Sequence, residues 1–190
     1  MKKVLLINRL GIGDVVVTTP LAQMLKEYYN AQVGMIVSPK AVDIIRNHPY
    51  IDDAYGYDKH AVKELIADVR RRGYREAVIA DERLTSTLLA RKTGCRLVNY
   101  GFEISIGKGR LFIRKRRAYR AIPDYCDYIR CFDPGLKVKE YAPVVGKADD
   151  ASREKVAVWL RDNGFGEQKP VLIVPRGVAD VKNWPVEYLA

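Results

Sequence analysis

Short apolar runs alternate with amphipathic stretches along the first hundred residues, and this alternation restricts the fold more than any other feature. The first run, residues 4–7, reads VLLI without a polar residue. Runs of this kind are typical of strands that are buried on both faces of a parallel sheet. We expect strands at 4–7, 33–37, 53–57, 77–80 and 96–100, with helices ending near residue 30 and covering 41–47, 60–72 and 85–93. The short connections between them predict an α/β fold with a doubly wound, Rossmann-like parallel sheet.

The turn after the first expected strand, residues 9–14, contains Gly11 and Gly13. Glycines here are typical of dinucleotide-binding turns, but that fingerprint has a third glycine where this chain has Val16. It also has an acidic residue at the end of the second strand, where this chain has Ser38. The sequence therefore argues against a nicotinamide-dependent enzyme. The two glycines are interpreted as allowing a tight turn and the close approach of a ligand to the backbone.

The first helix is expected to begin near Pro20. Proline is favoured in the first turn of a helix, where its missing N–H is not needed. Thr18 or Thr19 stands just before it and is a suitable capping residue.

A second amphipathic helix is expected at residues 150–163, with Asp149 or Asp150 as its cap. Its inward face is predicted to consist of Val156, Trp159 and Leu160. A further apolar strand, residues 171–174, follows it. One strand with part of a helix cannot bury its own apolar surface, so a second domain is expected to open near residue 168. The predicted domains are residues 1–167 and the truncated start of another domain at 168–190.

Several classes of protein are disfavoured by composition. No apolar run approaches the roughly 18 residues of a membrane span, and the apolar run at the N-terminus is too short for a signal peptide. We therefore expect a cytoplasmic protein. Cys95, Cys126 and Cys131 form no C-x-x-C pair, and the two histidines, His48 and His60, stand apart. No metal site is expected, because zinc ligands cluster at short spacing.

A run of positive charge interrupts the α/β pattern. The net charge of the chain is +10, and the run has no acidic residue between positions 104 and 120. Its cations are Lys108, Arg110, Arg114, Lys115, Arg116, Arg117 and Arg120. One interpretation is a solvated loop. Another is a surface that binds anionic lipid head groups, because Leu111, Phe112 and Ile113 stand among the cations. Nucleic acid is a third possibility, although no known nucleic-acid-binding motif is visible.

Four segments in order resemble the ADP-heptose:lipopolysaccharide heptosyltransferases, which are glycosyltransferases of family 9. The first is Arg9-Leu10-Gly11-Ile12-Gly13-Asp14, followed by Thr18-Thr19-Pro20. The second is His48-Pro49-Tyr50-Ile51-Asp52, and the third is Leu88-Leu89-Ala90-Arg91. The fourth is Pro175-Arg176-Gly177 with Lys182-Asn183-Trp184-Pro185. Each motif alone is weak, and the specificity lies in their order and spacing.

The resemblance implies the N-terminal half of a two-domain GT-B glycosyltransferase. Such an enzyme would transfer a heptose-type sugar from an ADP-sugar to the lipopolysaccharide core, or to a related anionic glycolipid, with inversion. The ADP-sugar is a co-substrate, and no cofactor or metal is implied. The enzyme would be peripheral on the cytoplasmic face of the inner membrane and would not bind nucleic acid. The 190-residue chain alone is expected to be inactive, because half of the cleft is missing.

The resemblance also assigns roles to particular residues. Asp14 becomes the general base, although an acidic residue there is equally suited to capping a helix. Asp81 is the rival base, because it also follows a buried strand. The expected donor-phosphate residues are Arg176, Gly177 and Lys182. The expected acceptor residues are Arg9, Gly11, Gly13, Lys108, Arg110, Arg114 and Lys115. The alternative to an enzyme is a non-catalytic module that binds an anionic glycolipid or nucleic acid.

Overall fold

The computed structural model describes residues 1–81, 83–98, 135, 137 and 141–165, and the backbone alone of 102–107 and 110–115. The chain divides into two compact units, Met1–Lys147 and Ala148–Ala190. The boundary expected near residue 168 stays a prediction.

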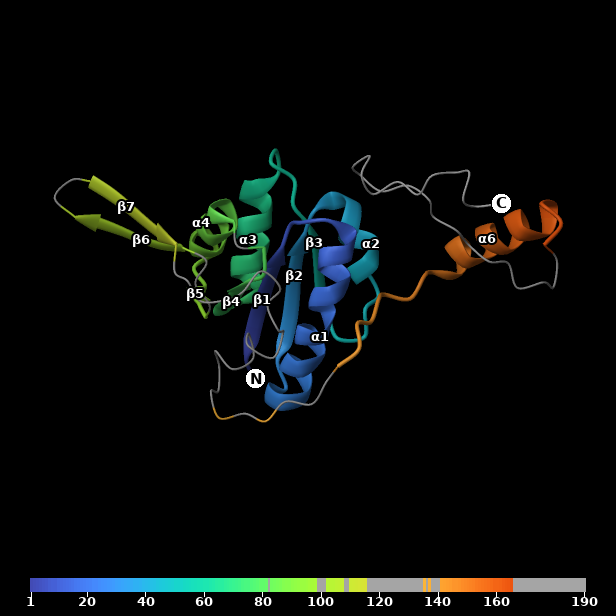
Figure 1. Cartoon of the computed structure of the whole chain (residues 1–190), viewed down its shortest axis with the longest axis horizontal. Helices are drawn as coiled ribbons and strands as arrows, with labels where there is room; N and C mark the ends of the chain where they lie inside the picture. Colours follow the sequence, from blue (N-terminus) through green and yellow to red (C-terminus); the bar gives the residue numbers. More distant parts are fainter. Residues whose placement is uncertain are drawn as a thin grey trace, which may run out of the picture. The chain divides into compact units, whose positions relative to one another are not determined.

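The first unit is built on a five-stranded parallel sheet (Figure 1). Its strands are β1 (Lys3–Asn8), β2 (Gln32–Val37), β3 (Asp53–Gly56), β4 (Glu76–Ile79) and β5 (Arg96–Leu97). They lie in the order β3-β2-β1-β4-β5, and every neighbouring pair is parallel. The doubly wound α/β fold predicted from the apolar runs is therefore confirmed.

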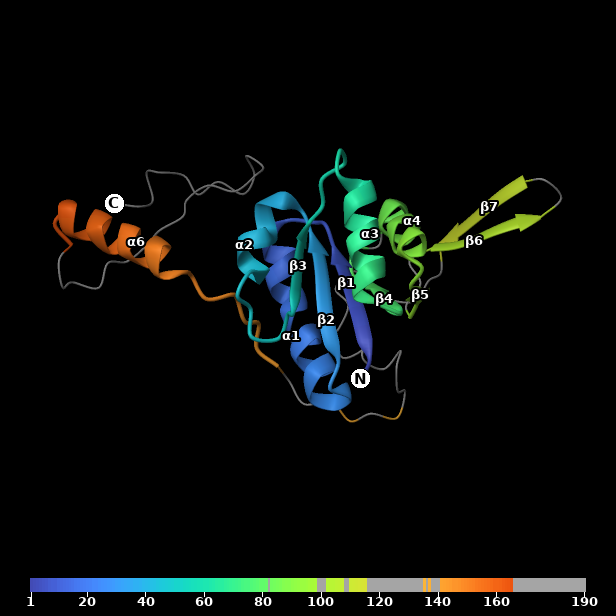
Figure 2. The same cartoon turned by 180° about the vertical axis from the view of Figure 1, so that it is seen from behind.

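Helices cover both faces of the sheet, as Figures 1 and 2 show from opposite sides. The helices of the first unit are α1 (Ile12–Tyr29), η1 (Pro39–Ala41), α2 (Val42–Ile45), α3 (Val62–Arg72) and α4 (Leu84–Thr93). Alternate residues of β1 face the two layers. Leu6 is buried with Leu25 of α1, whereas Ile7 is buried with Val69 of α3. Each of these side chains contributes about 1.5–3 kcal/mol through removal from water.

The first helix begins at Ile12, well before Pro20. The expectation that Pro20 lies in the first turn is wrong. A proline inside a helix leaves the carbonyl four residues earlier without its usual N–H donor. In α1 that carbonyl belongs to Val16, and the Thr19 hydroxyl donates a hydrogen bond to it over 2.8 Å. The helix therefore continues through the proline to Tyr29.

The strand order creates a switch point next to β1. β2 and β3 lie on one side of β1, whereas β4 and β5 lie on the other. The loops that leave β1 and β4 therefore diverge at the carboxyl edge of the sheet. In open α/β sheets this is where ligands bind.

The segment expected to be a basic loop contains a hairpin. It is formed by β6 (Phe102–Gly107) and β7 (Arg110–Lys115), paired antiparallel with Ile104 opposite Ile113. The segment is rich in positive charge, but its β-branched and aromatic residues favour strands. The helix expected at 122–133 lies outside the described residues.

In the second unit, α6 spans Asp150–Asp162. Asp149 is its cap, since its carboxylate accepts a hydrogen bond from the Ser152 N–H over 2.6 Å. The expected inward face is not observed, because Val156 and Trp159 are exposed and α6 has no buried residue. The described part of this unit has no second layer against which α6 could pack. The expected strand at 171–174 lies outside the described residues.

Across the described ranges, no helix is long and apolar enough to cross a membrane.

Candidate functional site at the carboxyl edge of the sheet

The loop between β1 and α1 is held in place by hydrogen bonds to its backbone. The Arg9 N–H donates to Asp81 Oδ2 over 3.0 Å, across the switch point. The Leu10 N–H donates to Asn8 Oδ1 over 3.1 Å, and the Ser38 hydroxyl donates to the Leu10 carbonyl over 3.1 Å. Side chains at the ends of β1, β2 and β4 therefore fix this loop.

Asn8 is the buried centre of this arrangement, with 2% of its surface exposed. Its Nδ2 donates to the Asp14 carbonyl over 3.0 Å and to the Thr18 hydroxyl over 2.7 Å. Asn8 was not predicted from the sequence as a residue of the site. The available signal was a polar residue that directly follows an apolar run at the edge where sites form.

Asp14 is the third residue of α1, and its side chain is exposed. Its Oδ2 accepts a hydrogen bond from the N–H of Gly11, the residue that precedes the helix, over 3.1 Å. Asp14 therefore helps to close the first turn, although it is not itself the cap. Its Oδ1 accepts no hydrogen bond from the described residues. One carboxylate oxygen is thus engaged and the other is available.

Gly11 and Gly13 leave the start of α1 open. Gly11 has a φ of −71°, so its conformation does not require glycine. The φ of Gly13 is not positive, and a Cβ there would meet no atom within 4 Å. The short turn between β1 and α1 therefore does not require glycine at either position. The described residues provide no acceptor for the N–H groups of Ile12 and Gly13, so donors and the positive end of the helix dipole face open space.

Arg9 is largely buried, with 7% of its side chain exposed. Its Nε donates to Ser86 Oγ over 2.9 Å, and the guanidinium also donates to the Thr85 hydroxyl. Its Cζ lies 4.2 Å from the ring centre of Tyr57, which directly follows β3. The guanidinium therefore joins the end of β1 to the residue after β3 and to the first turn of α4. Its predicted contact with an acceptor stays a prediction.

Asp81, the rival base, is committed to structural hydrogen bonds. Its side chain is fully buried. Its Oδ2 accepts from the Arg9 N–H and, over 2.7 Å, from the Ser86 hydroxyl, while its Oδ1 accepts from the Arg83 N–H over 3.1 Å. A carboxylate placed in this way anchors loops. Of the two candidates, Asp14 alone is open to solvent.

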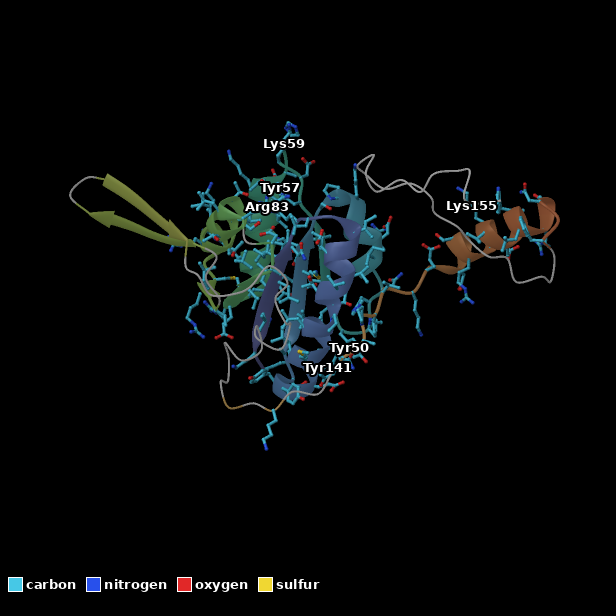
Figure 3. The ribbon with its side chains drawn as sticks, in the orientation of Figure 1. Tyr50, Tyr57, Lys59, Arg83, Tyr141 and Lys155 are labelled. Atoms are coloured by element: carbon cyan, nitrogen blue, oxygen red, sulfur yellow. The ribbon has the colours of Figure 1, made fainter. Side chains whose placement is uncertain are left out.

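Two cations not predicted from the sequence lie at the same edge. Lys59 and Arg83 are at the end of the sheet where Tyr57 lies, whereas Tyr50 and Tyr141 lie lower on the molecule (Figure 3). Lys59 follows β3, and Arg83 directly precedes α4. Both are exposed, so each can contribute positive potential at this edge of the sheet.

The other predicted site residues are not brought to this edge by any described contact. Arg110, Arg114 and Lys115 belong to β7, of which only the backbone is described. The remaining four lie outside the described residues, and they are Lys108, Arg176, Gly177 and Lys182.

The motif at residues 48–52 has a structural role in the first unit. His48 is buried, and its Nδ1 accepts a hydrogen bond from the Tyr50 N–H over 3.1 Å. Its Nε2 therefore carries the proton and donates to the Val144 carbonyl over 3.0 Å. Burial lowers the pKa of His48 below its usual value of 6.5. Asp52 in turn accepts from the Val33 N–H over 2.7 Å.

Within the described ranges, no cluster of three His, Cys, Asp or Glu residues is arranged to hold a metal ion.

Comparison with known proteins gives matches in structure but not in sequence. No protein-family model and no curated protein matches the chain. A solved glycosyl transferase of family 9 from Veillonella parvula DSM 2008 matches with a TM-score of 0.74 and 14% identity. The match covers 99% of this chain and 58% of that one. The chain shares its fold with a family 9 glycosyltransferase. The predicted resemblance is thus confirmed in structure.

A second similar structure is the E. coli ADP-heptose lps heptosyltransferase II. It matches with a TM-score of 0.59 and 13% identity, over 90% of this chain and 53% of that chain. The chain thus spans little more than half the length of either solved structure. At such low identities, the TM-scores show a shared fold alone.

Proposed function

We propose that the protein is a glycosyltransferase that transfers a heptose-type sugar from an ADP-sugar to an anionic glycolipid acceptor, such as the lipopolysaccharide core. The observation that carries this proposal is the exposed carboxylate of Asp14 beside the open backbone of Gly11 and Gly13. This arrangement lies at the carboxyl edge of the sheet, in a fold shared with a family 9 glycosyltransferase.

In the proposed reaction Asp14 acts as the general base. Its free oxygen accepts the proton of an acceptor hydroxyl while the hydroxyl oxygen attacks the anomeric carbon of the donor sugar. The bond from that carbon to the diphosphate oxygen breaks, and ADP leaves with the bonding electron pair. A single displacement of this kind inverts the anomeric centre. The buried hydrogen bonds of Asn8 and Asp81 hold the loop in place, which favours accurate positioning of the Asp14 carboxylate.

The binding roles follow from charge. Arg176, Gly177 and Lys182 are proposed to hold the diphosphate of the donor through cations and a backbone N–H. Lys108, Arg110, Arg114 and Lys115 are proposed to contact the anionic acceptor, with Arg9, Gly11 and Gly13 forming the wall near the reacting hydroxyl. Such an acceptor would place the protein at the cytoplasmic face of the inner membrane.

The test is turnover of ADP-heptose by the protein in its complete natural form, with a lipopolysaccharide-core acceptor. Release of ADP that depends on the acceptor is expected. The Asp14→Asn variant is expected to lose about 10²–10⁴-fold in kcat, because a general base typically contributes that much. Asparagine keeps an oxygen that can accept from the Gly11 N–H, so the first turn of α1 remains closed.

The matched control is Asp43→Asn, which removes an exposed carboxylate from the first turn of α2 and should leave kcat unchanged. Full activity of Asp14→Asn would remove Asp14 from the chemistry. Binding of the glycolipid without turnover of any ADP-sugar would favour the non-catalytic binding module.

A further inference from the structure

A concave region lies at the opposite edge of the sheet, where β1, β4 and β5 begin. Its volume is about 580 Å³, a size typical of small-molecule sites. Figure 1 marks the N-terminus at this end of β1. None of the residues assigned to the proposed reaction lines this amino-edge hollow.

The lining of the amino-edge hollow is strongly basic. It contains four cationic residues, Lys2, Lys3, Arg75 and Arg96, and one acidic residue, Glu76. Arg96 forms an ion pair with Glu76 Oε1. The pair leaves an excess of positive charge along the wall, which favours an anionic ligand.

The backbone fixes the positions of these cations. The Arg75 N–H donates to the Lys3 carbonyl over 3.2 Å, and the Arg96 N–H donates to the Arg75 carbonyl over 2.8 Å. Gly73, which ends α3 with a φ of +77°, adds no side chain to the wall. The wall of the hollow therefore consists of residues at the starts of strands and at the end of a helix. Few residues have to become ordered when a ligand binds there.

Interactions with the C-terminal end of α3 explain only part of the positive charge in the wall of the hollow. Lys3 Nζ donates to the Arg72 carbonyl over 2.7 Å and so satisfies the last turn of α3. Arg75 has no comparable role, because its guanidinium makes no hydrogen bond or ion pair with the described residues. Its donors are available to a ligand.

Glu76 is closed to a ligand in the hollow. Its Oε2 is buried, so a ligand hydroxyl does not reach it. Its Oε1 forms the ion pair with Arg96. An anionic ligand in the hollow is therefore held by the cations of the wall.

We propose that the amino-edge hollow binds a small phosphate ester. The phosphate contacts the Arg75 guanidinium and the Lys3 ammonium. A sugar phosphate and a nucleotide share this chemistry. The site is independent of the proposed sugar transfer, because it lies at the other edge of the sheet.

The experiment is a titration of the ¹⁵N-labelled 190-residue chain, with ribose 5-phosphate, inorganic phosphate and ribose as probes. Saturable shifts are expected at the amides of Lys3, Arg75 and Arg96 with ribose 5-phosphate. Inorganic phosphate should shift the same amides, because the phosphate group makes the proposed contacts, and ribose should shift none of them. AMP in a parallel titration distinguishes a nucleotide from a sugar phosphate as the preferred ligand.

Variants locate the binding. Arg75→Ala is expected to weaken ribose 5-phosphate binding by about two- to fivefold, the loss expected for one exposed charged contact. Arg46→Ala, which removes an exposed arginine from the end of α2, is the matched control and should change nothing.

Shifts confined to the amides of Gly11 to Asp14, with weakening by Arg83→Ala in place of Arg75→Ala, would assign the phosphate to the carboxyl edge and overturn the proposal. The absence of saturable shifts up to about 10 mM probe would also overturn it, since that corresponds to binding weaker than about −3 kcal/mol.

Discussion

The Nδ2 of Asn8 donates a hydrogen bond of 2.7 Å to the hydroxyl of Thr18, which joins the end of β1 to the second turn of α1. Both side chains are buried. The same Nδ2 also reaches the Asp14 carbonyl, so the turn that carries the proposed base is tied to the central strand of the sheet. The proposed base therefore lies in a turn whose position is fixed by buried hydrogen bonds.

Replacement of Asn8 should destabilise the first unit. Asn8→Ala removes the donor to Thr18 and the acceptor for the Leu10 N–H, and it leaves buried polar groups without partners. We expect a loss of about 2–4 kcal/mol in the free energy of unfolding, measured with urea. Thr18→Val keeps the shape of the partner and removes its hydroxyl, so its cost should be smaller. Equal stability of Asn8→Ala and the unchanged chain would contradict this role.

The compensation of Pro20 by Thr19 can be tested with a double-mutant cycle. Thr19→Val removes the hydroxyl that donates to the Val16 carbonyl and accepts from the Val144 N–H. We expect it to cost about 1–3 kcal/mol of unfolding free energy. In a Pro20→Ala background the restored N–H can serve Val16, so the same change should cost about 1 kcal/mol less. Additive effects in the cycle would show that the hydroxyl does not replace the missing N–H.

The burial of His48 predicts that the folded chain loses stability in mild acid. Burial lowers the pKa of His48, so the unfolded chain takes up a proton at a higher pH than the folded chain does. The contribution to stability is therefore complete above the unfolded pKa near 6.5 and declines as the pH falls below it. The urea midpoint is expected to decrease between about pH 7 and pH 5.

The matched pair for this prediction is His48→Gln and His60→Gln. His48→Gln should flatten the pH dependence of the urea midpoint, whereas His60→Gln replaces an exposed histidine and should leave it unchanged. A decline of the same size in His48→Gln would assign the effect to other groups.

Gly13→Ala tests whether a ligand approaches the backbone at this position, without a loss of stability. A Cβ at this position meets no atom within 4 Å, and alanine is the better helix former by about 1 kcal/mol. The unfolding free energy should therefore stay equal or rise. If a ligand approaches the backbone here, turnover of the ADP-sugar should fall at the same time. Unchanged turnover would mean that the space above Gly13 is not used.

The apolar runs by themselves determined the parallel sheet. The run at residues 4–7 lacks polar residues, and a strand without alternation must be covered on both faces. The same reasoning placed Asp14 just after a strand, at the edge where sites form. These predictions depend on local pattern and on burial, both of which can be read along the chain.

Only the tertiary structure decided which of these side chains are buried in structural hydrogen bonds and which are open to solvent. The backbone of Arg9 meets Asp81 across 72 positions of sequence, because β1 and β4 are neighbours in the sheet. That contact buries Asp81 and leaves Asp14 as the open carboxylate. The interior position of Pro20 in α1 likewise depends on a hydroxyl that replaces its missing N–H. Sequence patterns indicate whether a segment prefers a helix or a strand. Hydrogen bonds between loops depend instead on the order of the strands in space.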